Sequence, residues 1–224
     1  VYADIDSDTT NASVTTLEEA FKKDKKVKAV LIQHSLGIPA DSVAIRNWCK
    51  KNGLLLIEDV AQGIGGVDKN GESLGLHADA VVLSFGKDKI VDAISGGAVV
   101  FKNSNPALAE KVEDFRKTIS QVPFVYVYED LIYPDITSFI RKTHHFGFGK
   151  ILMVTCKFLG LLGSPIKSKT DTVTAMHPAY AKLALLQFTN LERQVLHRRR
   201  MAETYFKLLH ETSLEPLFDI SELK

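Results

Sequence analysis

The sequence has few cysteines and little net charge. Its 224 residues include two cysteines, Cys49 and Cys156, with no CxxC or Cys/His metal spacing. A disulfide framework is therefore excluded, no metal site is expected, and both thiols are interpreted as core residues. Lysine and arginine number 28 against 27 acids, a formal net charge of +1. This balance does not favour nucleic acid as a partner, so we expect a small-molecule substrate.

Long hydrophobic runs and targeting signals are also missing. The strongly apolar residues 151–162 contain Lys157 and fall short of the ~20 residues that span a bilayer. The start has no basic segment followed by an apolar one, as a signal peptide would, and no methionine. We therefore expect a cytoplasmic chain that opens within a domain and is truncated at its N-terminus.

Short apolar runs alternate with amphipathic stretches of helical length in the first half of the chain. Residues 27–33, 54–57 and 80–85 are near-continuous apolar runs, typical of strands buried on both faces. Helices are expected before, between and after these runs, at 16–23, 40–51 and 105–117, and a short strand is expected at 1–6. Residues 97–102 follow the third run too closely for a helical crossover, so they are predicted to pair with it antiparallel. The pattern indicates an α/β fold with a mainly parallel sheet.

The character of the sequence changes after about residue 120. An aromatic stretch with prolines shows neither a helical nor a strand period, and we interpret residues 121–174 as an insertion or connector. From about residue 176 to 211 the apolar spacing predicts one long amphipathic helix. The expected domains are therefore 1–120, the connector 121–174, and 175–224 as the start of a smaller domain.

A glycine-bracketed loop between two predicted strands, residues 84–97, contains Lys87 and Lys89. Loops at strand ends of α/β sheets are common ligand sites. A lysine shielded there from water favours its neutral amine, which is the form that reacts with carbonyl groups. The alternative is a solvated surface turn with two lysines, and the loop alone favours that alternative.

A carboxylate follows the second apolar run directly, as Glu58-Asp59. Charge at the end of a buried strand requires a compensating partner. A carboxylate in this place can pair with the protonated ring nitrogen of pyridoxal phosphate. A helix cap or a salt bridge is the commoner explanation of such an aspartate, so the argument depends on both loops together.

Four segments in this order and spacing together resemble a known family. They are Val-Tyr-Ala-Asp-Ile-Asp from residue 1, Gln-His-Ser-Leu-Gly-Ile-Pro-Ala-Asp from 33, Leu-Ile-Glu-Asp-Val-Ala-Gln from 56, and the loop 84–97. The pattern is similar to the DegT/DnrJ/StrS sugar aminotransferases, which are pyridoxal-phosphate enzymes of fold type I. The resemblance covers about residues 1–117 and 176–209. It implies a three-layer α/β/α large domain with a mostly parallel mixed sheet, incomplete here, and the start of a small C-terminal α/β domain.

The resemblance implies a role for each of five residues. Lys89, five positions after Ser84, would carry the cofactor on its amine and later move a proton. Asp59 would keep the pyridine nitrogen protonated, so that the ring accepts electrons. Gln62 would lie near the ring hydroxyl, and Ser84 would bind the cofactor phosphate. His34 would lie near the cofactor, although a histidine at a strand end is often only a hydrogen-bonded structural residue.

The reaction implied is transfer of an amino group, usually from glutamate, to a nucleotide-linked keto sugar by a homodimer, in polysaccharide or secondary-metabolite biosynthesis. Some members have histidine in place of the lysine and dehydrate the sugar, so Lys89 favours transamination, provided that Lys87 is not the true counterpart. A non-catalytic scaffold is a further alternative. The family's glycine-containing phosphate loop and ring-stacking aromatic are not in this chain. We therefore expect this fragment alone to be poorly stable and inactive.

Residues 123–174 exceed what ordinary members carry at this place. Arg141, Lys142, Lys150 and Lys157 accompany many apolar side chains there, which is the composition of an interfacial amphipathic helix. Contact with a membrane surface through about residues 139–162 is one hypothesis. A hairpin that packs on the domain or across a dimer is the alternative, and is favoured. The apolar side chains are Phe139, Ile140, Phe146, Phe148, Ile151, Leu152, Phe158, Leu159 and Leu162.

Overall fold

The computed structural model describes residues 1–102, 106–158, 173–210 and 212. They belong to two compact units, one formed by Val1–Lys111 with Leu183–Lys224 and the other by Val112–Lys182. Leu159, Leu162 and the side chain of Phe146, which the sequence placed in the apolar segment, lie outside the described residues. The three domains expected from the sequence stay a prediction, because compactness alone does not define a domain.

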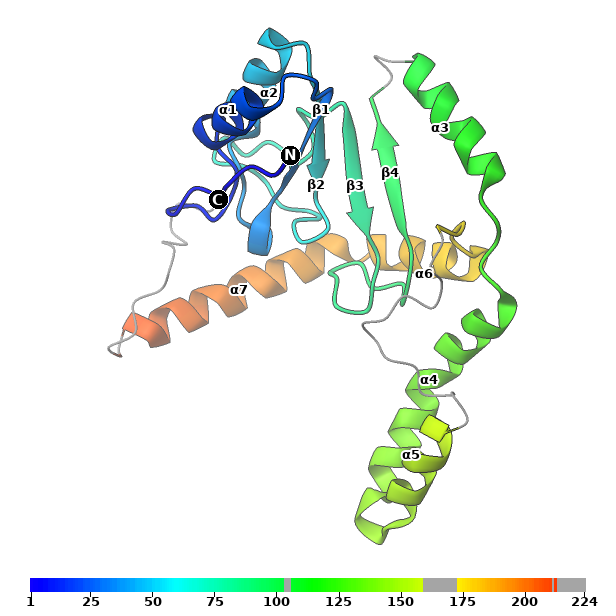
Figure 1. Cartoon of the computed structure of the whole chain (residues 1–224). Coiled ribbons are helices and arrows are strands. Elements are labelled where there is room, and N and C mark those ends of the chain that lie inside the picture. Colours follow the sequence, from blue (N-terminus) through cyan, green and yellow to red (C-terminus); the bar gives the residue numbers. More distant parts are fainter. Residues whose placement is uncertain (103–105, 159–172, 211, 213–224) are drawn as a thin grey trace. The chain divides into compact units, whose positions relative to one another are not determined.

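A four-stranded sheet with the order β1-β2-β3-β4 is the centre of the first unit (Figure 1). Strands β1 (Ala29–Gln33), β2 (Leu55–Asp59) and β3 (Ala80–Ser84) run parallel. Strand β4 (Gly97–Phe101) pairs antiparallel with β3. The α/β fold with a mostly parallel mixed sheet is therefore confirmed, and so is the antiparallel partner inferred from the short loop.

Helices α1 (Val14–Lys23) and α2 (Ser42–Lys51) lie beside the sheet (Figure 1). Both helices are capped at their N-terminal ends. At the start of α1, the backbone N–H of Ser13 and that of Thr16 each donate to the side-chain oxygen of the other residue. At the start of α2, the Asp41 carboxylate accepts the Ala44 N–H. Their apolar sides build the core with one face of β1 and β2, and Cys49 is part of it, as expected. The core members include Leu17, Val30, Ile32, Ile45, Cys49 and Leu56. On the opposite face Leu31 is 61% exposed.

Asp79 links α2 to the sheet directly before β3 begins. Its carboxylate accepts two hydrogen bonds from the Arg46 guanidinium, with Nη2 at 2.8 Å from Oδ1, and one from the Leu56 N–H at 2.8 Å. Burial alone would raise the pKa of Asp79, but the bonds from Arg46 and Leu56 bring it below its usual value. The aspartate is therefore held as a charged acceptor.

Replacing Asp79 with asparagine is expected to lower the free energy of unfolding by about 2 kcal/mol, since hydrogen bonds to charged groups contribute most. Urea unfolding followed by circular dichroism measures this change. The control is Asp114→Asn, which breaks an exposed pair with Lys117 on a helix surface and should cost about 0.5 kcal/mol or less. Equal effects of the two substitutions would contradict the role of Asp79.

The aromatic stretch after residue 120, which showed no clear period in the sequence, is helical. It forms α4 (Phe124–Thr143), the short turn η2 (His144–Phe146) and α5 (Phe148–Phe158). Only a narrow side of α4 is buried, through Val127, Asp130 and Ile140. Exposed aromatic residues on its other sides hide the helical period. The same unit contains most of α3 (Pro106–Thr118), and the helix expected there is confirmed.

The long helix predicted for residues 176–211 is two helices, α6 (Pro178–Phe188) and α7 (Leu191–His210). The break falls at Thr189 and Asn190. Both side chains donate to the Leu186 carbonyl, with the Thr189 hydroxyl at 2.7 Å and the Asn190 amide at 3.4 Å. Such local bonds compete with the helical ladder and explain the interruption.

The expected strand at residues 1–6 does not form. This segment has no ladder with β1 or with any other strand among the described residues. A strand exists only through pairing with a neighbour, so extended residues without one remain irregular. Ala3 nevertheless packs against the core.

Candidate active site

Two predicted site residues end neighbouring parallel strands. Asp59 is the last residue of β2 and Ser84 the last of β3. Asp59 pairs with Val82, so Ser84 is two residues further along and its side chain leaves the same face of the sheet. At a rise of about 3.3 Å per residue, Ser84 lies about 7 Å beyond the Asp59 register along the strand. The structure therefore brings these two side chains to one face of one sheet edge.

The polar atoms of both side chains are available to a ligand. One carboxylate oxygen of Asp59, Oδ1, accepts the Ala61 N–H at 2.8 Å. Within the described part of the chain, the second oxygen and the Ser84 hydroxyl form no hydrogen bond. A charged acceptor and a hydroxyl donor thus face the same side, which suits a ring nitrogen that carries a proton and a phosphate.

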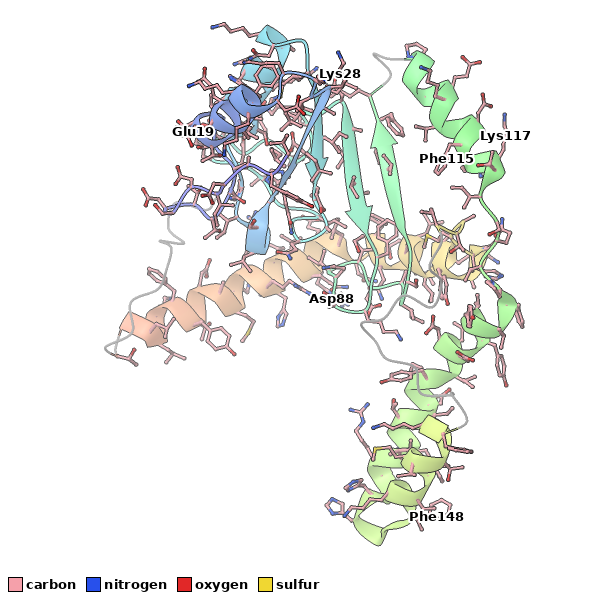
Figure 2. All side chains as sticks on the ribbon, viewed as in Figure 1. Glu19, Lys28, Asp88, Phe115, Lys117 and Phe148 are labelled. Atoms are coloured by element: carbon pink, nitrogen blue, oxygen red, sulfur yellow. The ribbon has the colours of Figure 1, made fainter. Side chains whose placement is uncertain are left out.

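Lys89 follows on the loop that leaves β3. Its N–H closes a turn with the Gly86 carbonyl at 3.0 Å, and its amine lies 3.1 Å from the Asp88 carboxylate. The Lys89 side chain is 19% exposed, whereas that of Asp88 is 78% exposed. Figure 2 shows Asp88 on this loop. The hydrogen bond from Lys89 lowers the pKa of Asp88 below its usual value. Lys87, the alternative cofactor lysine, is exposed.

The loop that carries Lys89 is anchored on both sides. Val91 and Ala93 are fully buried, and the Ala93 N–H donates to the Phe85 carbonyl at 3.0 Å. Gly97, which pairs with Ser84, must be a glycine because a Cβ there would lie 2.5 Å from the Leu83 carbonyl oxygen. These contacts fix the base of the loop and thereby restrict where the lysine amine can reach.

Gln62 lines a pocket of about 530 Å³. Its side-chain oxygen accepts the Leu36 N–H at 2.6 Å. Ile90, next to Lys89, also lines this pocket, as do Arg198 and Arg199 of α7. Both arginines are exposed but line this pocket.

Helix α7 reaches the pocket because it packs on the loop that follows β2. Gly65 has a φ of +80°, and a Cβ there would lie 2.8 Å from a methyl carbon of Val195. Only a glycine allows this close approach in that backbone conformation. Leu191 contacts the same glycine position. The pocket wall is thus fixed by backbone packing as well as by side chains.

His34 lies on the other face of the sheet and does not join Asp59 and Ser84. Its side chain is fully buried, and Nε2 lies 3.0 Å from a Glu58 carboxylate oxygen. The Ala40 N–H donates to Nδ1 at 3.1 Å, so the proton of a neutral ring is on Nε2 and is donated to Glu58. Burial would raise the pKa of Glu58, but the bonds from His34 and Gly75 lower it. Sequence reasoning did not find this buried pair.

A separate group of side chains could hold a metal ion. Ligand atoms of Asp68, Glu72 and His77 lie within 4.8 Å of one another on the turn after β2. Asp68 already accepts the N–H groups of Asn70 and Glu72, and His77 lies 2.8 Å from Glu72. These hydrogen bonds stabilise the turn and explain why the three side chains lie close together.

The fold is part of the fold type I that occurs in aminotransferases. The aminotransferase TlmJ from Streptoalloteichus hindustanus matches 95% of this chain with a TM-score of 0.63 and 22% identity, and the match covers 46% of that structure. The model of the DegT/DnrJ/EryC1/StrS aminotransferase family matches residues 1–127, more than half of the sequence. The chain belongs to this family, whose members are sugar aminotransferases that use pyridoxal phosphate.

Individual relatives match this chain over limited parts of their own length. GDP-perosamine synthase of Vibrio cholerae is 36% identical over 100 residues, which are 45% of this chain and 26% of that protein. The structure of DesI with its TDP-sugar product has a TM-score of 0.53 and 27% identity, and the match covers 90% of this chain and 39% of DesI. The chain thus spans less than half the length of these relatives.

Proposed function

We propose that the whole protein uses pyridoxal phosphate to transfer an amino group from glutamate to a nucleotide-linked keto sugar. The observation that carries this proposal is a pair of polar atoms on one face of the sheet edge, Asp59 Oδ2 and Ser84 Oγ, which have no hydrogen-bond partner among the residues that the structure describes. Family membership supports the reaction class. A nucleotide-linked sugar is supported by the names of the relatives, a GDP-perosamine synthase and DesI with a TDP-sugar. A cytoplasmic homodimer is part of the same proposal.

The residues present fit the cofactor. Asp59 Oδ2 would accept the proton-bearing ring nitrogen, and the Ser84 hydroxyl would donate to the phosphate. Gln62 would lie near the ring hydroxyl, with its oxygen already held by Leu36. When bound, pyridoxal phosphate withdraws electrons from the carbon that carries the amino group. Asp59 supports this withdrawal because a carboxylate keeps the ring nitrogen protonated.

Lys89 would hold the cofactor and move the proton of the reacting carbon. Its amine is an ammonium when it is paired with Asp88, and it must lose that proton before it can attack a carbonyl. His34 would act on the cofactor only indirectly, because both nitrogens of its buried ring are engaged in hydrogen bonds, one with Glu58 and one with the Ala40 N–H.

Replacing Asp59 with asparagine tests the proposal. The substitution keeps the size of the side chain but removes the charge that holds the ring proton. We expect kcat for amination of a nucleotide-linked keto sugar to fall by about 100-fold or more, a typical loss for one electrostatic contact in an active site. Transfer of label from ¹⁵N-glutamate to the sugar measures the rate in the whole protein.

Asp114→Asn on the exposed surface of α3 is the matched control and should leave the rate unchanged. If the wild-type protein releases water from the sugar and transfers no nitrogen, the dehydratase alternative replaces this proposal. If it does neither and retains no cofactor, a scaffold role replaces it.

A further inference from the structure

From residue 136 to residue 158, the last part of α4, the turn and α5 carry charge of one sign. No aspartate or glutamate occurs between Asp135 and Asp171. The described residues 136–158 contain Arg141, Lys142, Lys150 and Lys157, all exposed. The whole chain has a net charge of +1, so this segment is strongly basic relative to the remainder. Its surface is suited to an anionic partner.

Helix α5 turns an apolar stripe outward. Ile151, Val154 and Phe158 are 68%, 62% and 90% exposed, and their spacing of three and four places them on one side of the helix. Phe148, one turn earlier, is also exposed, and Figure 2 shows it where α5 begins. The opposite side packs inward through Cys156, which is 5% exposed. The outward stripe is therefore distinct from the side that stabilises the hairpin.

The hairpin is tightly closed, which keeps the stripe exposed. Gly149 is buried, and a Cβ there would overlap the Ile140 carbonyl oxygen and the His144 backbone. Gly147 has a φ of +76° in the turn, and the Phe139 and Phe148 rings meet edge to face with centroids 6.4 Å apart. The stripe on α5 cannot turn inward without breaking these contacts.

Lysines border the stripe. Lys150 and Lys157 are seven residues apart, so they lie on one side of α5, next to the side that carries Val154. An apolar strip beside basic residues is the arrangement of a helix that lies flat in the headgroup region of a bilayer. Of the helices that the structure describes, none is long and apolar enough to cross a membrane. These side chains can therefore meet lipid only along the surface of a membrane.

We propose that the exposed side of α5 docks on the surface of a bilayer that contains anionic phospholipids. The side chains of Ile151, Val154 and Phe158 enter the boundary of headgroups and acyl chains, and the two lysines contact lipid phosphates. A second copy of this chain is a poorer occupant, because a symmetric pair through this side would place the same positive charges opposite one another.

The test is flotation of the whole protein with vesicles. Equimolar phosphatidylglycerol and phosphatidylcholine should bind the wild type, and phosphatidylcholine alone should bind it much less. The double variant Lys150→Gln/Lys157→Gln should weaken binding on the order of 25-fold, from about fivefold for each lysine. Ile151→Asn/Phe158→Asn should weaken it about tenfold or more. All four positions are exposed, so helix content should stay unchanged.

Matched controls are Tyr205→Asn/Leu208→Asn on α7, which removes exposed apolar side chains elsewhere, and Lys22→Gln/Lys23→Gln on α1. Both should bind as the wild type does. Equal recovery of all variants, or equal binding to both vesicle types, would overturn the proposal. So would a wild-type oligomer that binds no lipid and that Ile151→Asn/Phe158→Asn dissociates, since the occupant is then a second copy. If vesicles float none of the wild type and a protein binds the wild type but not Ile151→Asn/Phe158→Asn, the occupant is a protein and the proposal is overturned equally.

Discussion

Lys89→Ala is expected to abolish covalent retention of the cofactor and to lower the rate of transamination on the order of 10³-fold. The lysine would supply both the amine that holds pyridoxal phosphate and the group that moves the proton of the reacting carbon. General acid–base catalysis alone contributes about 10²–10⁴-fold. Borohydride reduction of the loaded whole protein, followed by mass spectrometry of the loop peptide, locates the attachment. The visible spectrum before and after reduction reports the loss independently.

Lys87→Ala is the matched control, because it removes a lysine two residues away on the same loop. Its side chain is exposed, whereas that of Lys89 is 19% exposed and paired with Asp88. The control should keep the cofactor and most of its activity. A reduced cofactor found on Lys87 in the wild type, or a visible band that survives in Lys89→Ala and disappears in Lys87→Ala, would assign the role to Lys87.

The strands could be predicted because their signals are local. Runs such as residues 54–57 and 80–85 are apolar and end at polar residues, and β2 and β3 form at these places. Helix α4 could not, because only three of its residues are buried and aromatic residues cover its exposed sides. The break between α6 and α7 depends on side chains of Thr189 and Asn190 that turn back to one carbonyl.

The part of the candidate site that lies at the ends of strands could be predicted from the sequence. Asp59 and Ser84 follow apolar runs directly, and the register places them on one face. The buried surroundings of His34 were not predicted, although the alternation of side chains between the two faces of the strands indicates them. His34 and Glu58 continue the buried faces of Ile32 and Leu56, which indicates the core side. The arginines of α7 reach the pocket only through tertiary packing, for which a single sequence carries no signal.

Replacing Glu58 with alanine is expected to destabilise the first unit by about 3–5 kcal/mol, which is the usual loss when one partner of a buried charged contact is removed. The carboxylate is fully buried and accepts hydrogen bonds from His34 at 3.0 Å and from the Gly75 N–H at 2.9 Å. Alanine leaves both donors buried without an acceptor, and unsatisfied donors of this kind cost about 1–3 kcal/mol each. Urea unfolding of the variant and the wild type measures the difference.

The pH dependence of stability distinguishes the charge of Glu58 from its shape. The pKa of the folded carboxyl is below its ordinary value of 4.5, so its contribution is present above that pH and is lost as the pH falls through the lower folded pKa. Glu58→Gln keeps the shape and should therefore remove this part of the acid sensitivity. Glu113→Ala, at an exposed pair with Arg116, is the control and should leave the free energy of unfolding nearly unchanged, because solvent screens an exposed pair. A Glu58→Ala variant as stable as this control would show that His34 and Gly75 find other acceptors, and the pair would then not support the strand ends that position Asp59.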